Sequence, residues 1–184
     1  RQRQMCIRDR FITYGIKSIQ RGVVDRKSPY RLPVLSTSVE GNVSQRIVVA
    51  RGFDEKNLQL IVFTDNASKK YQQLQINSKC ALLFWDPRKK LQIQVNGKAN
   101  FIKEKDMYWN NLSDRQKKEY VINPIPGSKI ESAQSYNYDS EETRFAVLSI
   151  QFDHIDMLQL SSDGHKRAGC ILRQCKREDF WMCP

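Results

Sequence analysis

The chain has 184 residues, a formal net charge of +11, 40% apolar residues and 28% charged residues. This length and composition are typical of one globular domain with a buried core. No apolar run approaches the ~18 residues of a membrane-spanning helix, so we expect no membrane segment. The excess of positive charge favours an anionic partner, such as a phosphorylated cofactor or nucleic acid.

The cysteines show neither a disulfide framework nor a zinc motif. Their number is odd and no two are spaced as Cys-x-x-Cys; they are Cys6, Cys80, Cys170, Cys175 and Cys183. The two histidines, His154 and His165, are too few for a His-rich metal centre. We therefore expect no metal site, and we expect a reducing compartment, the cytoplasm.

The first ten residues, RQRQMCIRDR, look foreign to the rest of the chain. They resemble the translation of a transposon-end adapter used in sequencing libraries. We expect residues 1–10 to be a non-native tail and residues 11–184 to form a single domain. The natural N-terminus, with any targeting signal, would then lie outside this sequence. The abrupt end at Pro184 indicates a shortened C-terminus as well.

Apolar periodicity predicts the elements of the first half of the chain. Ile12, Ile16 and Ile19 recur at helical spacing, which predicts a helix from Phe11 to Gln20. Strands are predicted on both sides of a hairpin turn at residues 40–42, and a short amphipathic helix follows the third strand. The predicted ranges are strands Val34–Val39, Val43–Arg51 and Leu58–Phe63, and helix Ala67–Ser78.

The second half predicts more strands around one helix and one long loop. Leu91 to Val95 alternates between apolar and polar residues, and Asn96-Gly97 indicates a bulge before the strand resumes. Short strands joined by hairpin-length turns are typical of an antiparallel barrel. The ranges are strands Cys80–Trp85, Leu91–Val95 and Ala99–Ile102, helix Lys105–Tyr120, loop Val121–Thr143, and strands Phe145–Phe152, Ile155–Leu160, Arg167–Gln174 and Phe180–Trp181.

The stretch from Arg46 to Lys70 collects groups that bind phosphate. Arg46 and Arg51 bracket the apolar run Ile47–Ala50 of one predicted strand, and the next strand leads through Thr64 to Ser68, Lys69 and Lys70. The last three lie where a helix begins. Cationic side chains, hydroxyl donors and the N–H groups of a helix N-terminus all favour a bound phosphate. Arg46 and Arg51 are five positions apart in the chain, so a regular strand would point their side chains to opposite faces.

A series of short motifs resembles a known family. In chain order they are Arg46-x-Val-Val-x-Arg51, Phe63-Thr-Asp-x-x-Ser-x-Lys70, Leu82-x-Phe-Trp85, Gln92-x-x-Val-x-Gly-x-Ala99 and His165-x-Arg167. Their order and spacing resemble the pyridoxamine 5′-phosphate oxidase-like, FMN-binding split-barrel proteins, closest to the Alr4036-type FMN-binding domain branch. The resemblance implies a six-stranded antiparallel split β-barrel with flanking helices, and it covers the chain from about Phe11 onward.

The resemblance also implies a cofactor site and a partner. The cofactor would be FMN, bound at the interface of a homodimer, with Gln92 on the flavin ring and Arg167 supplied across the dimer. Arg51, Tyr108 and His165 would be the candidate substrate contacts. Ser128 lies near the family's second-subunit contacts. The full set of implied cofactor residues is Arg46, Ile47, Val48, Val49, Arg51, Phe63, Thr64, Ser68, Lys69, Lys70, Gln92 and Arg167.

The sequence departs from the oxidase pattern where the substrate would bind. Asp163 replaces the first arginine of an Arg-x-His-x-Arg motif, and a negative charge there would repel a substrate phosphate. Leu112 and Gln116 stand where an arginine and a serine are expected, although Arg115 is close enough to replace one of them. A late tryptophan of the family corresponds here to Met157 or Leu158. The resemblance therefore supports FMN binding in this chain more strongly than oxidation of pyridoxamine phosphate.

Three hypotheses follow for the function. The first is an FMN-dependent oxidoreductase with an unassigned small-molecule substrate, and the second is a non-catalytic module that stores or senses FMN. The third, nucleic-acid binding, is disfavoured because Phe84, Trp85 and Trp109 fall in apolar patterns and do not alternate with a basic stripe.

Overall fold

An antiparallel sheet forms the centre of the fold in the computed structural model, which describes residues 7–139, 143–173 and 176–184. Nine strands of the described chain join it, in the order β11-β10-β9-β6-β5-β1-β2, with β4 paired to β9 and β3 to β4. The strands are β1 (Val34–Val39), β2 (Asn42–Ile47), β3 (Gly52–Asp54), β4 (Gln59–Asp65), β5 (Lys79–Asp86), β6 (Leu91–Ile102), β9 (Phe145–Gln159), β10 (Lys166–Arg173) and β11 (Lys176–Met182). A separate pair consists of β7 (Ile122–Asn123) and β8 (Asn137–Tyr138).

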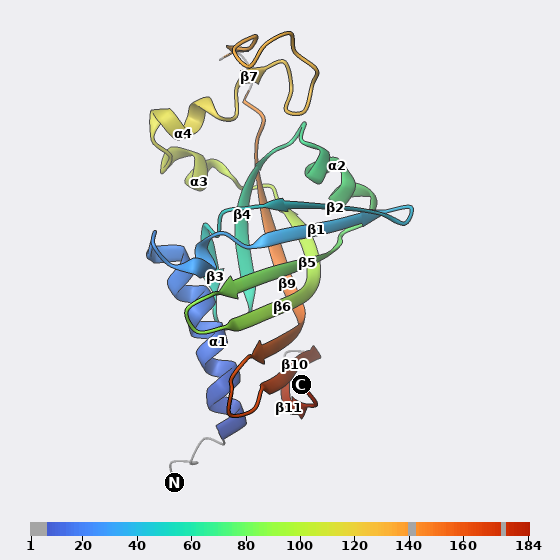
Figure 1. The fold of residues 1–184 in the computed structure, drawn as a ribbon. Helices are drawn as coiled ribbons and strands as arrows, with labels where there is room; N and C mark the ends of the chain where they lie inside the picture. Colours follow the sequence, from blue (N-terminus) through green and yellow to red (C-terminus); the bar gives the residue numbers. More distant parts are fainter. Residues whose placement is uncertain (1–6, 140–142, 174–175) are drawn as a thin grey trace.

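The long strand β9 splits the sheet (Figure 1). Its first part, Phe145–Gln151, pairs with β4, and its last part, from His154 to Gln159, pairs with β10. Strand β6 runs along the other edge of β9 over both parts. The predicted antiparallel split barrel is confirmed. The sheet contains more strands than the predicted six because the short β3 and the β10–β11 hairpin are also part of it.

The alternation in β6 determines which face is buried. Leu91, Ile93 and Val95 are fully buried, whereas Gln94 and Asn96 are exposed. The predicted bulge is also present, because the register between β6 and β9 shifts at Asn96/Gly97. A Cβ atom on Gly97 would lie 2.2 Å from the Gln151 carbonyl oxygen, so this close approach of two strands requires glycine.

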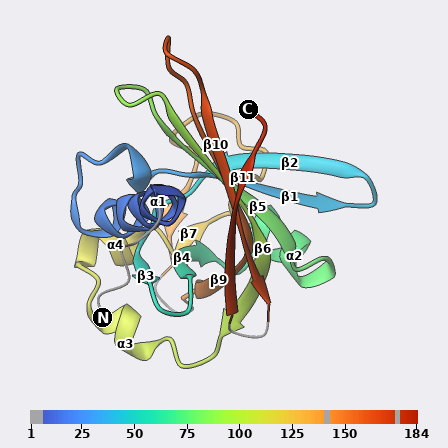
Figure 2. The same cartoon turned by 90° about the horizontal axis from the view of Figure 1, so that it is seen from below.

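Helix α1 (Ile7–Val24) lies beside the sheet (Figure 2). Its Ile12, Ile16 and Ile19 are buried in the core. The helix extends beyond the predicted range Phe11–Gln20 at both ends. Residues 7–10 are therefore helical, although their expected non-native origin stays a prediction. The other helices are the 3-10 turn η1 (Pro29–Arg31), α2 (Lys69–Ile76), α3 (Asp106–Asn110) and α4 (Asp114–Lys118).

Several predicted elements differ in the structure. Strand β2 ends at Ile47, because Val48 and Ala50 donate their backbone hydrogen bonds to the irregular segment 31–33 instead of a strand. The predicted helix 105–120 is two short helices, because Ser113 forms a capping box with Gln116 and starts a new helix there. The two strands predicted between residues 145 and 160 are the single strand β9.

Within the described ranges, no helix combines the length and apolar character that a membrane span requires.

Candidate functional site

Two hydroxyl groups and two cations converge at the N-terminus of α2. Ser68 is the N-cap residue of this helix, and its Oγ lies 3.1 Å from Thr64 Oγ1 at the end of β4. Both side chains are buried. Lys70 lies in the first turn of α2 and is half-buried, whereas Lys69 is exposed. The structure therefore assembles most of the phosphate-binding groups that the sequence predicts.

Arg46 reaches this place from the edge strand β2. It is paired with Leu35, which faces the core, so Arg46 also lies on the core side of the sheet. Its guanidinium donates hydrogen bonds to the Leu35 carbonyl oxygen (3.3 Å), Thr37 Oγ1 (2.7 Å) and Gln73 Oε1 (3.0 Å). These acceptors are all neutral. They fix the orientation of the guanidinium without neutralising its charge.

Burial disfavours the charged forms of Arg46 and Lys70. It lowers the pKa of Arg46. It also lowers the pKa of Lys70, and the nearby charge of Arg46 lowers it further, while Asp65 acts in the opposite direction. Neither cation forms an ion pair with an acidic side chain in the part of the chain that the structure describes. An anion bound between them would relieve this repulsion.

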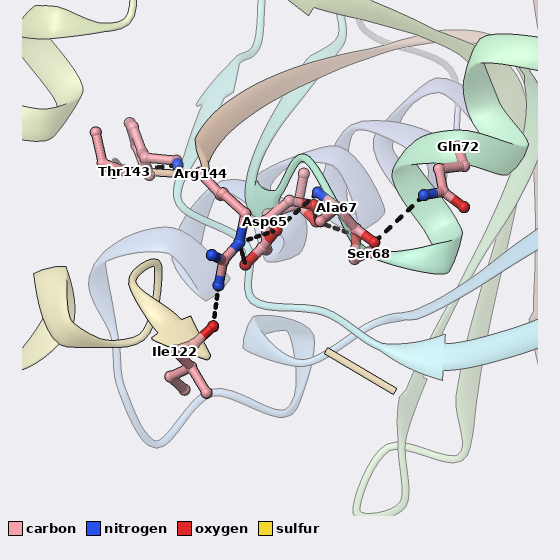
Figure 3. A network of polar contacts seen from close by, with 9 residues as sticks. Asp65, Ala67, Ser68, Gln72, Ile122, Thr143 and Arg144 are labelled. Atoms are coloured by element: carbon pink, nitrogen blue, oxygen red, sulfur yellow. Dashed lines mark hydrogen bonds and ion pairs between the residues drawn. The ribbon is translucent and has the colours of Figure 1, made fainter. Parts of the chain in front are cut away.

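Asp65 is already engaged by another cation (Figure 3). Its carboxylate accepts hydrogen bonds from Arg144 Nε at 3.0 Å and from the Ala67 backbone N–H at 2.7 Å. Arg144 also donates to the Ile122 carbonyl oxygen. This network connects the loop before α2 to the beginning of β9. It gives the predicted phosphate-binding loop a fixed shape, and within the described residues it leaves Arg46 and Lys70 without an ion-pair partner.

Arg51 belongs to a second group on the other side of β4. Its guanidinium lies 5.4 Å from the centre of the Phe63 ring, and Phe63 makes an edge-to-face contact with Tyr108 at 5.6 Å. These residues line a cavity of about 310 Å³ together with Leu112 and Gln116. Arg46 and Arg51 therefore face different surroundings, in agreement with their five-residue separation.

Arg115 does not compensate for the missing arginine in this cavity. It is exposed on α4 and is not among the residues that line the cavity. The suggestion that Arg115 could replace a family arginine gains no support from this cavity and stays a prediction.

Gln92 and Arg167 form a third group on the outer face of the sheet. Strand pairing places Trp85, Gln92, Leu158 and Arg167 in one row across β5, β6, β9 and β10. Leu158 rather than Met157 shares this face, since Met157 is fully buried. Gln92 and Arg167 of the same chain therefore lie two strands apart on this face, whereas the resemblance implies that the Arg167 at a flavin site comes from the other subunit.

Arg167 has a partner that the sequence analysis missed. Its Nε and Nη2 donate to the two carboxylate oxygens of Asp156 at 3.0 and 2.7 Å, and these hydrogen bonds raise the pKa of Arg167. Asp156 faces Gly169 across the β9–β10 pair. The alternation of apolar and polar residues does not determine the register of β9 against β10, so no sequence signal indicated the Arg167–Asp156 pair.

The remaining predicted residues are scattered. In the run that follows Arg46, Ile47 is exposed, Val48 is buried and Val49 is intermediate. His165 is exposed in the β9–β10 turn, where its Nδ1 accepts a hydrogen bond from the Ser161 backbone N–H at 3.1 Å. Ser128 is also exposed. In the described ranges, no group of three or more His, Cys, Asp or Glu side chains is placed to hold a metal ion.

Comparison with known proteins identifies the family. Residues 16–103 match the family model described as the pyridoxamine 5′-phosphate oxidase, FMN-binding domain. A pyridoxine/pyridoxamine 5′-phosphate oxidase of Crocosphaera subtropica is 30% identical over 133 residues, which are 68% of this chain and 56% of that protein. The chain is thus related to the pyridoxamine 5′-phosphate oxidase-like family. The match to the family model contains every predicted cofactor residue except Arg167.

Other family relatives match over shorter segments. The oxidase of Trichormus variabilis is 28% identical over 78 residues, which are 42% of this chain and 36% of that protein. The matched segments thus span about a third to just over half of the length of these two relatives.

Solved structures show the same fold over nearly the whole chain. A pyridoxamine 5′-phosphate oxidase-related, FMN binding protein from Nostoc punctiforme has a TM-score of 0.76 at 21% identity, covering 95% of this chain and 97% of its own. PhzG from Burkholderia lata, solved with tetrahydrophenazine-1-carboxylic acid, has a TM-score of 0.74 at 17% identity, covering 94% and 92%. Both support the split-barrel fold.

Proposed function

We propose that the protein binds FMN and that Arg46 and Lys70 hold its phosphate. The observation that supports this is the pair of half-buried cations beside the α2 N-terminus, with no acidic partner in the described chain. A phosphate monoester carries close to two negative charges and accepts several charge-assisted hydrogen bonds. The Thr64 hydroxyl donates to the Asp65 carbonyl oxygen, so Ser68 is the hydroxyl that would turn toward the phosphate at the same place.

The backbone of α2 fits the same group. The first N–H groups of a helix have no intrahelical acceptor and lie at the positive end of its dipole. Lys69 and Lys70 occupy these positions in α2, an eight-residue helix. The Asp65–Arg144 network holds the preceding loop in place. These residues therefore fit a phosphate without further rearrangement of the loop.

The flavin ring would lie against the outer face of the sheet. Gln92 offers an amide for hydrogen bonds to the ring, and Ile47 at the end of the edge strand and Val49 just after it offer apolar contact. When bound, the flavin supplies two-electron redox chemistry. Arg51 and Tyr108 would hold a substrate in the cavity beside Phe63, and His165 would contact it only if the β9–β10 turn approaches the ring.

A homodimer would complete this site. The outer face exposes large apolar side chains on β2 and β5, the two strands that flank β1: Val43 (67% exposed), Ile47 (65%), Leu83 (37%) and Trp85 (44%). A second copy would cover them, and Arg167 and the 121–143 segment would face that copy. Sedimentation should give a dimer for the natural chain and a monomer for Trp85→Glu. The exposed Trp181→Glu variant is the control and should remain dimeric.

We infer an oxidoreductase that does not act on pyridoxamine phosphate. Leu112 gives the cavity an apolar wall where the family has an arginine, and the second arginine of the cavity, Arg31, already donates to the Val23 carbonyl oxygen. Asp163 adds a negative charge to the β9–β10 turn. A non-catalytic FMN-binding module is the alternative, favoured by the pairing of Arg167 with Asp156 and by the exposure of His165. Flavin bleaching by candidate substrates in the absence of oxygen supports the enzyme, whereas a flavin that no amine or alcohol reduces supports the module.

The test of FMN binding is the visible spectrum of the protein after incubation with FMN and desalting. The natural chain and Lys56→Ala, which removes an exposed lysine of the β3–β4 turn, should keep flavin absorbance. Arg46→Ala should lose it, because a charged hydrogen bond is worth about 1.5–3 kcal/mol. Equal retention by Arg46→Ala and the natural chain would show that the phosphate is bound elsewhere.

A further inference from the structure

A second basic cleft lies between α1, the segment that follows it and the β5–β6 turn. Its volume is about 690 Å³, larger than the cavity beside Phe63. None of its lining residues belongs to the predicted cofactor set. Its basic residues are Lys17, Arg21, Lys27, Arg88 and Lys89.

The two acidic residues of the cleft are engaged by their neighbours. Asp25 pairs with Arg21 at 3.2 Å and accepts the Lys27 backbone N–H at 2.9 Å. Asp86 accepts the backbone N–H groups of Arg88 at 3.0 Å and Lys89 at 3.2 Å. Five cations therefore surround two engaged carboxylates, and the rim of the cleft keeps a net positive charge.

Three of the five cations remain available for a ligand. In the described part of the chain, no acidic side chain forms an ion pair with Lys17, Lys27 or Arg88. Lys89 lies over the Tyr14 ring at 4.6 Å and donates to the Tyr14 hydroxyl. The rim thus combines exposed cations with one cation that lies over an aromatic ring.

The base of the cleft contains a buried hydroxyl without a partner. Tyr30 is 4% exposed, and its Oη forms no hydrogen bond. The Ser18 hydroxyl is close by but donates to the Tyr14 carbonyl oxygen at 2.8 Å. Burial and the nearby Asp86 charge raise the pKa of Tyr30, so the phenol remains a neutral donor. Native structures rarely leave such a group unsatisfied.

We propose that this cleft binds a small phosphorylated compound that also carries hydroxyl groups, such as a sugar phosphate. The rim cations would hold the phosphate. At the base, Tyr30 Oη would donate to a ligand hydroxyl. Asp86 is 5% exposed, and its negative charge excludes the phosphate from the base and favours a hydroxyl there. The different chemistry of rim and base therefore orients the ligand.

The test is calorimetric titration of the full-length protein with ribose 5-phosphate, inorganic phosphate and ribose. It is done in the natural chain and in a Lys70→Ala background, so that phosphate bound at the α2 N-terminus is counted separately. Lys17→Ala/Arg88→Ala should weaken ribose 5-phosphate binding at least about tenfold in both backgrounds, because each cation contributes a charged hydrogen bond. The matched control, Lys56→Ala/Lys176→Ala, removes two exposed lysines elsewhere and should leave the affinity within about twofold.

Tyr30→Phe tests the base of the cleft by removing only the orphan hydroxyl. It should weaken ribose 5-phosphate about fivefold and leave inorganic phosphate unchanged, since a neutral hydrogen bond is worth about 1 kcal/mol. It should not lower the melting temperature of the ligand-free protein. Three results would each overturn the proposal: no binding at millimolar ribose 5-phosphate, equal losses in the two double variants, or unchanged affinity in Tyr30→Phe. Inorganic phosphate bound as tightly as ribose 5-phosphate would also overturn it.

Discussion

Replacing Lys70 by methionine should stabilise the ligand-free protein and weaken its binding of FMN. Lys70 is half-buried, and both burial and the Arg46 charge lower its pKa, so its charged form is disfavoured in the folded state. Methionine keeps the length and apolar stem of the side chain but removes that charge. The gain should be a few tenths to about 1 kcal/mol, the range for partly exposed charges. The melting temperature should then rise by about 1–4 °C.

The same substitution should cost FMN affinity. The charged hydrogen bond that it removes is worth about 1.5–3 kcal/mol, a factor of about 10 to 150 in Kd. Flavin fluorescence quenching measures the affinity and calorimetry measures the stability. Lys69→Met is the matched control, since Lys69 is exposed and should change the stability little.

The pH dependence has a defined sign. A lysine with a lowered folded-state pKa leaves the folded protein binding fewer protons than the unfolded chain between the two pKa values. The destabilisation is therefore complete below the folded-state pKa and fades as the pH rises toward the ordinary value. The advantage of Lys70→Met should be larger at neutral pH than near pH ~10. A variant that is less stable than the natural chain at neutral pH, or that binds FMN equally well, would refute the reasoning.

Three further predictions concern the framework of the site. Gly97→Ala should lower the free energy of unfolding by about 1–3 kcal/mol, because its Cβ would meet the Gln151 carbonyl oxygen at 2.2 Å. The measurement is urea denaturation, and an unchanged midpoint would contradict that close approach. Arg144→Met should cost about 3 kcal/mol by leaving the Asp65 carboxylate, 7% exposed, without its cation, and adding Asp65→Asn should restore part of the loss in a double-mutant cycle. The Cys80 thiol, whose pKa is raised to about 12 by burial, should resist iodoacetamide at pH ~8 while the exposed Cys183 reacts, as measured by peptide mapping; equal labelling would be contrary to that burial.

The sequence was most informative where a local pattern was sufficient. The alternation in Leu91–Val95 predicted the buried face of β6, and Asn96-Gly97 predicted the bulge. The hairpin turn was also correct, because Glu40 and Gly41 adopt the positive φ values that its glycine indicated. Helix and strand ends were less predictable. The end of β2 depends on residues 31–33, which offer no strand to pair with Val48 and Ala50.

The candidate site was predictable only where its residues follow from a local sequence pattern. The positions of Ser68 and Lys70 follow from a strand that leads into a helix N-terminus, which is a local signal. The groups that orient Arg46 are not local, since Thr37 and Gln73 are 9 and 27 residues away from it in the chain. The Arg167–Asp156 pair likewise depends on a strand register that composition and alternation do not determine.

The edge strand β2 explains why the proposed site needs both faces of the sheet. Arg46 faces the core side, where Lys70 and α2 lie, while the next residue, Ile47, faces outward in the same row as Leu83. A ligand whose phosphate contacts Arg46 and whose ring contacts Gln92 must therefore pass around the free edge of β2. There it would lie between the phosphate-binding loop and the exposed apolar side chains of the outer face. A ring held on that face alone would keep one side in water, and the second copy that we propose would cover both the ring and the apolar side chains. Flavin binding and dimerisation would then stabilise each other, because each buries surface that the other leaves exposed.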